Sequence, residues 1–321
     1  MNETIGVVIA TYNGEKYIEQ QLQSIVFQSK VPNLIVLSDG GSTDCTLDIA
    51  RNTLCSSGIE YKIFESEVRL DVVNNFEKAL RECNTDIIFF SDQDDVWDYE
   101  KIETTARFLK DNGACLAFTD AFITDDDLKK RNINLWTSVG YKQTEDFVVY
   151  KKGDNQLKEE LIKHNIITGM TMCITAGLKE AILPLSKYDL HDKWTALVAV
   201  YYGSIIAVNK RLVLYRQHAS NSIGTDFNAF SSLKKGINYK NTIVYRQKMI
   251  KDLDERISTI MQTKHQELGE YYDYLDTRVA YMEKRFGLTH ILKILRQYKR
   301  YERYPSRIIF RDVYYRCFYG R

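Results

Sequence analysis

The chain has 321 residues, of which 44% are hydrophobic and 27% charged, the composition of a globular protein with room for one or two domains. Its net charge of +1 gives no indication of a nucleic-acid partner, and no apolar run approaches the ~20 residues that cross a membrane. The six cysteines are scattered without a Cys-x-x-Cys pair, which favours a reducing compartment over a disulfide scaffold or a zinc site.

The first half of the chain alternates between short apolar segments and helical patterns. The apolar run Ile5 to Ala10 has no basic residue before it and predicts a strand rather than a signal peptide, so we expect a cytoplasmic protein. Further strands are predicted at Leu34–Leu37, Tyr61–Phe64 and Ile87–Phe90, each followed by a helical pattern. This alternation implies an α/β fold with a mostly parallel sheet flanked by helices.

Polar segments follow three of these strands at the point where each strand ends. They are Thr11 to Gly14, Asp39 to Thr43 and Asp92 to Asp95. In an open α/β sheet, ligands bind beyond the carboxyl ends of the strands, so three such segments on one edge indicate a binding site. A P-loop and a dinucleotide-binding fingerprint are excluded, because neither glycine pattern is present after the first strand.

Three carboxylates, Asp92, Asp94 and Asp95, lie within four residues directly after a predicted buried strand. Like charges this close oppose joint ionisation, and a hard divalent cation with oxygen ligands is the usual compensation. Asp92 and Asp94 point to the same side of an extended segment and can share one ion or its water shell. Alternatively, Asp94 or Asp95 caps the following helix, which accounts for one of the three. An EF-hand is excluded, because Val96 and Trp97 stand where that loop needs an oxygen ligand and a glycine.

Additional strands are predicted between residues 114 and 215. They lie at Ala114–Phe118, near Ile166–Met172, at Ser204–Val208 and at Arg211–Tyr215, with Asn209 and Lys210 as a turn between the last two. Residues 131–155 are polar with few pattern signals, and we interpret them as a mobile region near the site.

Two later segments carry candidate functional side chains. Asp192 precedes an apolar helix that runs to Tyr202, so it is either favoured there by the helix dipole or acts as a general base. Asp189 is an equal competitor for the role of base. His218 follows the last predicted strand and is either a structural histidine or a ligand of metal or phosphate.

The last part of the chain is helical in pattern, basic and rich in tyrosine. Residues 284–321 contain eleven Lys and Arg against two acids, a net charge of +9. Apolar side chains from Leu288 to Tyr298 form one helix face beside lysines and arginines, which suits an anionic membrane surface. The alternative is a helix packed on the first domain or on another subunit. We therefore divide the chain into residues 1–225 and a helical region of residues 226–321.

Five motifs follow one another in a fixed order along the chain. They are Val7-Val8-Ile9-Ala10-Thr11-Tyr12-Asn13-Gly14, Ser38-Asp39-Gly40-Gly41-Ser42-Thr43-Asp44, Asp92-Gln93-Asp94-Asp95-Val96-Trp97, His191-Asp192-Lys193-Trp194 and Tyr215-Arg216-Gln217-His218. Together they resemble the family 2 glycosyltransferases of the GT-A fold, and most of all the bacterial rhamnosyltransferase-like branch. The resemblance covers about residues 5–224 and does not extend to the basic tail.

The resemblance implies roles for residues of these motifs and for Arg69, which lies between the second and third motifs. Thr11, Tyr12 and Asp39 hold the base and ribose of a nucleotide sugar, and Asn13, Gly41, Arg69 and Gln93 complete its site. Asp92 lies near the ribose and the metal, Asp94 ligates Mg²⁺ or Mn²⁺, His218 contacts the metal or the diphosphate, and Asp192 is the catalytic base.

The function implied by the resemblance is an inverting, metal-dependent sugar transfer. The best match is rhamnose from dTDP-rhamnose, moved to a saccharide or lipid-linked acceptor in cell-surface polysaccharide synthesis at the inner face of the membrane. UDP-galactose, UDP-glucose and UDP-N-acetylglucosamine are alternative donors. A nucleotidyltransferase needs a Gly-rich, basic loop after the first strand, which Thr11 to Lys16 matches poorly. The alternative that is not an enzyme is a membrane scaffold protein with a non-catalytic nucleotide-binding fold.

Overall fold

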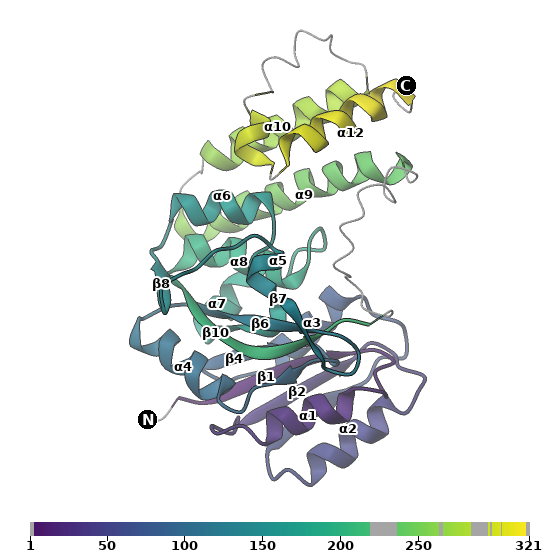
Figure 1. The fold of residues 1–321 in the computed structure, drawn as a ribbon, viewed down its shortest axis with the longest axis vertical. Coiled ribbons are helices and arrows are strands. Elements are labelled where there is room, and N and C mark those ends of the chain that lie inside the picture. Colours follow the sequence, from purple (N-terminus) through teal and green to yellow (C-terminus); the bar gives the residue numbers. More distant parts are fainter. Residues whose placement is uncertain are drawn as a thin grey trace. The chain divides into compact units, whose positions relative to one another are not determined.

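The structure is a computed structural model that describes residues 3–218, 236–262, 266–283, 295, 297–302 and 304–318. The chain forms two compact units (Figure 1). The sheet unit comprises residues 1–154, 165–185 and 190–222, and the helical unit comprises residues 155–164, 186–189 and 223–321. The domain boundary predicted between residues 225 and 226 lies outside the described residues.

Four parallel strands form the first half of the sheet. They are β1 (Ile5–Thr11), β2 (Leu34–Asp39), β3 (Glu60–Phe64) and β4 (Ile87–Ser91), in the order β3-β2-β1-β4. The helices α1 (Ile18–Val26), α2 (Thr46–Cys55) and α3 (Val72–Glu82) connect them. The predicted alternation of strands and helices is confirmed, and with it the α/β fold class.

Helices cover both faces of this sheet, which explains why its inner strands are apolar on both sides. Ile5, Val7 and Ile9 belong to a core shared with the apolar sides of α1, α2 and α4 (Lys101–Asp111). On the other face Gly6 packs against the end of α3, where a Cβ would overlap Cys83. In Figure 1, α1 and α2 lie side by side on their face of the sheet.

The other half of the sheet mixes parallel and antiparallel strands. It contains β5 (Val96–Trp97), β6 (Leu116–Thr124), β9 (Met172–Thr175) and β10 (Ile205–Arg216), and the order continues as β4-β9-β6-β10-β5. β9 is antiparallel to both β4 and β6, whereas β6 and β10 are parallel. Two short strands, β7 (Lys130–Asn134) and β8 (Phe147–Tyr150), pair with β6 and β10. The sheet unit also contains the helices α5 (Leu135–Ser138), α7 (Ala176–Ile182) and α8 (His191–Tyr202), and the 3₁₀ turn η1 (Gly169–Thr171).

Two predictions for this half are wrong. The strands expected at 204–208 and 211–215 are one continuous strand, because β10 pairs with β6 on both sides of the expected turn. Asn209 and Lys210 are exposed there, at an irregularity of the register. Residues 131–155, expected to lack regular structure, contain most of β7 together with α5 and β8. The buried Asp120 carboxylate organises them, since it accepts the backbone N–H of Trp136 at 2.9 Å.

The helical unit contains α6 (Asn155–Lys163), α9 (Gly236–Met261), α10 (Gln266–Met282) and α12 (Pro305–Phe318). The amphipathic helix predicted from Leu288 lies mostly outside the described residues, and its last apolar residue, Tyr298, is buried. In the described part of the chain, no helix combines the length and the apolar character needed to span a membrane.

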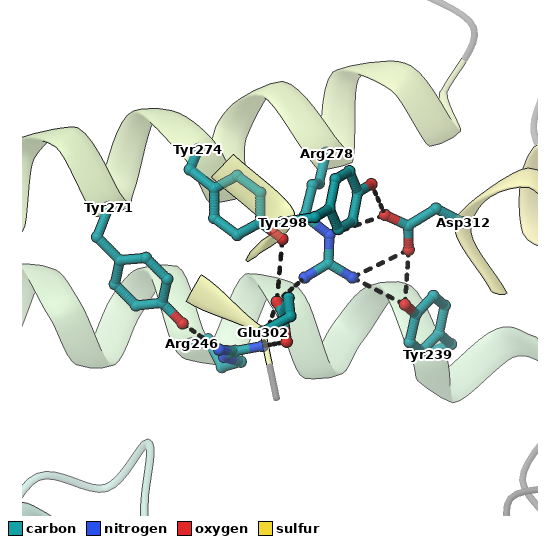
Figure 2. Close-up of polar contacts among 8 residues, drawn as sticks. All are labelled: Tyr239, Arg246, Tyr271, Tyr274, Arg278, Tyr298, Glu302 and Asp312. Carbon is teal, nitrogen blue, oxygen red and sulfur yellow. Dashed lines mark hydrogen bonds and ion pairs between the residues drawn. The ribbon is translucent and has the colours of Figure 1, made fainter. Parts of the chain in front are cut away.

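Figure 2 shows a buried cluster of charged and phenolic side chains in the helical unit. At its centre, the Arg278 guanidinium donates to Glu302 Oε1 at 2.6 Å and to the two carboxylate oxygens of Asp312 at 2.8 and 2.9 Å. Further donors to these carboxylates are Tyr239, Tyr274, Tyr298 and Arg246. Because the cluster joins α9, α10, α12 and the segment 297–302, it fixes how these helices pack on one another.

Candidate active site

The carboxyl ends of β1, β2 and β4 meet at one edge of the sheet. Thr11 lies opposite Asp39 in the parallel register, and Ile9 lies opposite Ser91, so the segments after these strands emerge next to one another. Thr11 Oγ1 donates to Asp39 Oδ1 at 2.8 Å in a buried position. The three polar segments are therefore brought to a single edge, as the sequence predicts.

Asp39 shapes the segment that follows β2. Its Oδ2 accepts the backbone N–H of Gly41 at 3.0 Å and that of Ser42 at 2.7 Å, and its Oδ1 also accepts the Ser42 hydroxyl at 2.6 Å. Gly41 has a φ of +89°, and a Cβ there would lie 3.1 Å from the carbonyl oxygen of Val68, so this turn requires glycine. The Asp39 carboxylate is predicted to contact the nucleotide. Through these hydrogen bonds it also fixes the conformation of the loop that follows β2.

One amide side chain joins the segments after β1 and β4. Gln93 Oε1 accepts the N–H of Tyr12 at 2.9 Å, and Gln93 Nε2 donates to the Tyr12 carbonyl at 3.1 Å. Asn13 links the segments after β1 and β2, because its Oδ1 accepts the N–H of Thr43 at 2.9 Å. The guanidinium of Arg69 lies 4.7 Å from the centre of the Tyr12 ring. Four residues predicted for the nucleotide site are therefore neighbours.

Three carboxylates from two distant parts of the sequence act on one another electrostatically. Burial, followed by repulsion from Asp94 and Asp192, raises the pKa of Asp92 to about 7. Asp192 belongs to α8, whereas Asp92 and Asp94 follow β4, so the first turn of α8 lies near the aspartate cluster. The site therefore concentrates negative charge at the edge where the three strands end.

Asp95 differs from its two neighbours because it is a structural residue. Its side chain is fully buried, its Oδ1 accepts the N–H of Arg216 at 3.1 Å, and burial next to other aspartates raises its pKa well above the usual range. Neither Asp94 nor Asp95 caps the next helix, since α4 begins at Lys101 after β5 and has Glu100 as its N-cap residue. The capping alternative is thereby excluded.

Asp192 lies in the first turn of α8 and is 6% exposed. Its Oδ2 accepts the N–H of Gly169 at 3.2 Å, and its Oδ1 accepts the N–H of Lys193 at 2.6 Å. Gly169 passes so close that a Cβ would stand 2.6 Å from the Nε2 atom of His191. The alternative residue, Asp189, belongs to the helical unit. Two backbone N–H groups therefore set the orientation of the Asp192 carboxylate.

His218 and Asp94 come together although 124 residues separate them. His218 Nε2 lies 2.9 Å from Asp94 Oδ2, and the two side chains are 7% and 14% exposed. Arg216, two residues before His218, donates through Nε to the main-chain carbonyl of Asp94 at 2.8 Å. The end of β10 is thus fastened to the aspartate cluster through a side chain and through the backbone.

These residues fit a divalent cation that is completed by a phosphate-bearing ligand. Among the described residues, no three His, Cys, Asp or Glu side chains are grouped closely enough to hold a metal ion alone. Asp94 Oδ2 and His218 Nε2 are in hydrogen-bond contact at 2.9 Å, and a carboxylate oxygen and an imidazole nitrogen are both atoms that could ligate Mg²⁺ or Mn²⁺. Mg²⁺ is commonly held by one or two carboxylates together with phosphates and water. Burial, and then the repulsion from Asp94 and Asp192, raises the pKa of Asp92, and a bound cation would oppose that repulsion.

Sequence reasoning missed two residues beside His218. Asp126 lies in the turn after β6, where its Oδ1 accepts the Tyr17 hydroxyl at 2.7 Å and its Oδ2 contacts Lys16 Nζ at 2.5 Å. The Tyr17 ring stacks on His218 with the ring centroids 4.5 Å apart. No local signal identifies this arrangement, because Tyr17 lies in none of the five motifs and is 109 residues from Asp126.

The family model described as glycosyl transferase family 2 matches residues 6–174, just over half of the chain. The chain belongs to this family and is a glycosyltransferase. It is 28% identical over 259 residues to the dTDP-rhamnosyl transferase RfbG of Shigella flexneri, a match that covers 76% of this chain and 82% of that protein. The resemblance to rhamnosyltransferase-like members, inferred from the motifs, is confirmed.

Solved structures with the same fold bind different nucleotide sugars. The S. aureus TarS 1-349 structure in complex with UDP-GlcNAc has a TM-score of 0.55 at 16% identity, covering 80% of this chain and 71% of that chain. The mannosyltransferase PcManGT from Pyrobaculum calidifontis, in complex with GDP-Man and Mn²⁺, has a TM-score of 0.53 at 14% identity, covering 98% and 85%. Identities this low concern the fold alone, and the predicted GT-A fold is confirmed.

Proposed function

We propose that this glycosyltransferase moves rhamnose from dTDP-rhamnose to an acceptor hydroxyl, with inversion at the anomeric carbon and with Mg²⁺ or Mn²⁺. The observation that carries the proposal is the convergence of Asp92, Asp94, Asp192 and His218 beside the strand ends. The donor is supported by the 28% identity to a dTDP-rhamnosyl transferase. UDP-galactose, UDP-glucose and UDP-N-acetylglucosamine are the alternative donors.

In this proposal the segments after β1 and β2 bind the nucleotide. Tyr12 offers its ring to the base, and Thr11 and Asp39 lie at the strand ends beside it, joined by a 2.8 Å hydrogen bond. Arg69, whose guanidinium lies 4.7 Å from the Tyr12 ring centre, reaches the same nucleotide. The side chains of Asn13 and Gln93 accept hydrogen bonds from backbone N–H groups, and these bonds hold the surface in one conformation before the donor binds.

The chemistry follows from the residues near the diphosphate. A cation held by Asp94, Asp92 and His218 supplies, when bound, the positive charge that a leaving nucleoside diphosphate requires. Asp192 accepts the proton of the acceptor hydroxyl as that oxygen attacks the anomeric carbon. Its carboxylate is oriented for this step by the N–H group of Gly169. A single displacement inverts the anomeric configuration, so no second carboxylate is needed as a nucleophile.

A nucleotide-release assay on the purified full chain tests the donor and the metal. dTDP-rhamnose and the three UDP-sugars are supplied with Mn²⁺, Mg²⁺ or EDTA, and dTDP release that EDTA abolishes is expected. Release from a UDP-sugar alone would replace the proposed donor. Binding by calorimetry without release would show that turnover needs the acceptor. Neither binding nor release would favour the non-catalytic scaffold.

Two substitutions separate the metal site from the base. Asp94→Ala and Asp192→Ala are each expected to abolish transfer, but only Asp94→Ala is expected to lose metal-dependent nucleotide binding, because Asp94 lies 2.9 Å from His218. Asp189→Ala, which alters the alternative carboxylate in the helical unit, serves as the matched control. Near-wild-type turnover of Asp192→Ala would rule out its role as the base.

We also propose that the acceptor is a cell-surface saccharide or its lipid-linked form, and that the protein works in the cytoplasm at the inner face of the membrane. The net charge of +9 in residues 284–321 supports this, as does α12, which exposes Phe310 at 61% and Val313 at 36% near the exposed Arg307. Flotation with anionic liposomes is expected, and flotation with neutral liposomes is the control. Protein that stays unbound to anionic liposomes would contradict the membrane part.

A further inference from the structure

The ring of Tyr17 lies where three separate segments of the sheet unit meet. Tyr17 is the N-cap residue of α1, yet its side chain makes no capping hydrogen bond. Instead, one face of the ring stacks on the His218 imidazole, with centroids 4.5 Å apart and planes 28° apart. The hydroxyl donates to Asp126 Oδ1 at 2.7 Å. The side chain is therefore held at its face and at its tip.

Asp126, which accepts the hydrogen bond of the Tyr17 hydroxyl, is itself held in place by other residues. Lys16 Nζ contacts its Oδ2 at 2.5 Å, and the Arg216 guanidinium donates to its main-chain carbonyl. The same guanidinium lies 4.9 Å from the centre of the Tyr17 ring and donates to the carbonyl of Asp94. Because the Lys16 and Asp126 side chains are 64% and 42% exposed, their ion pair adds little stability. These contacts therefore serve to fix the positions of the side chains.

The orientation of the His218 ring depends on contacts with neighbouring side chains. The strand β10 ends at Arg216, and Gln217 N–H still donates to the Thr124 carbonyl at 3.2 Å, so His218 lies just beyond the end of the strand. An imidazole can rotate about its side-chain bonds, and the observed orientation is the one that aims Nε2 at Asp94 Oδ2, 2.9 Å away. A flat aromatic partner fixes the plane of the ring, while the contact at Nε2 fixes its direction.

We propose that Tyr17 and Asp126 are positioning residues that hold the His218 ring with Nε2 aimed at Asp94. This inference rests on the proposed function, in which Asp94 and His218 hold a divalent cation at the diphosphate. In this proposal Tyr17 and Asp126 act through His218, which is the residue that contacts Asp94. Partners of this kind typically change metal affinity about 10- to 100-fold when they are removed.

The first test needs neither metal nor nucleotide. Tyr17→Leu removes the aromatic face and the hydroxyl, Tyr17→Phe removes the hydroxyl alone, and Tyr61→Leu alters a partly exposed tyrosine of β3 as the matched control. The ¹H–¹⁵N resonances of the His218 ring, assigned by comparison with His218→Ala, are measured in each full-length protein. They are expected to move most in Tyr17→Leu, less in Tyr17→Phe and not in Tyr61→Leu. Unmoved His218 resonances in Tyr17→Leu would overturn the inference.

The second test measures the binding of dTDP with Mn²⁺ by calorimetry in a double-mutant cycle. Tyr17→Leu is expected to weaken Mn²⁺-dependent binding about 10- to 100-fold, and to have no further effect when His218→Ala is already present. Additive losses would overturn the inference, because Tyr17 would then support the site by another route. If the unsubstituted protein shows no Mn²⁺-dependent dTDP binding while the His218 resonances move in Tyr17→Leu, the proposed function fails and the positioning role stands.

Discussion

Replacing Arg278 by methionine leaves two buried carboxylates without the cation at the centre of their cluster. Arg278 is 1% exposed, and Glu302 and Asp312 are 6% and 1% exposed. The guanidinium donates four hydrogen bonds of 2.6 to 2.9 Å, one to Glu302, two to Asp312 and one to the Tyr239 hydroxyl. Removing one partner of a buried ion pair costs about 3–5 kcal/mol, because the remaining charge stays out of water.

The two carboxylates are not affected equally by this substitution. Glu302 still faces Arg246, whose NH1 lies 3.0 Å from its Oε1. Asp312 keeps only hydroxyl donors in the cluster, those of Tyr239 and Tyr298 (Figure 2). We therefore expect a loss of at least about 3 kcal/mol in the free energy of unfolding of the helical unit.

Urea unfolding followed by circular dichroism measures this loss, and hydrogen exchange in α10 and α12 assigns it to the helical unit. Arg300→Met is the matched control, because Arg300 contacts Glu270 at 2.9 Å but is 46% exposed, so at most about 1 kcal/mol is expected. Adding Asp312→Asn to Arg278→Met removes the unpaired charge while Glu302 keeps Arg246, and most of the loss is expected to be recovered. Equal destabilisation by Arg278→Met and Arg300→Met would refute the reasoning.

Two further predictions concern the neighbourhood of Asp192. Burial lowers the pKa of His191 to about 3 from the ordinary value of 6.5, so below pH 6.5 the unfolded chain binds more protons than the folded chain. The free energy of unfolding should then fall by about 2 kcal/mol from pH 7 to pH 5 because of this residue. His191→Phe keeps a ring against Phe76 and should lose this component, and an equal pH dependence of the urea midpoint in both proteins would contradict the assignment. Gly169→Ala places a Cβ 2.6 Å from His191 Nε2 and should lower stability by about 1–3 kcal/mol and also kcat, since Gly169 donates to Asp192. An unchanged melting temperature would argue against this crowding.

Local patterns in the amino-acid sequence were sufficient for the first half of the sheet and for the position of the site. The runs at Leu34–Leu37 and Ile87–Phe90 correspond to β2 and β4 within two residues, because an apolar segment bounded by polar residues is a local property. Parallel strands joined by helices end on one side of a sheet, and Thr11 and Asp39 do meet there. The five motifs were also sufficient for the family.

Contacts between distant segments could not be predicted from local sequence patterns. The turn residues Asn209 and Lys210 suggest a hairpin, yet pairing with β6 on both sides keeps β10 continuous. The polar composition of residues 131–155 suggests an irregular loop, yet the buried Asp120 organises them. In both cases the local pattern is compatible with two structures, and a partner elsewhere in the chain selects one of them.

The surroundings of charged side chains could not be predicted from local patterns either. No sequence pattern marks Asp126 or Arg278, because contacts with distant residues are not a property of the residues next to them in the chain. Folding places Asp126 against Tyr17 beside His218, and it places Arg278 between two buried carboxylates. Arg278 is a core residue because packing removes its water and supplies two carboxylates, whereas Asp126 stays 42% exposed and becomes a positioning residue through partners from other elements.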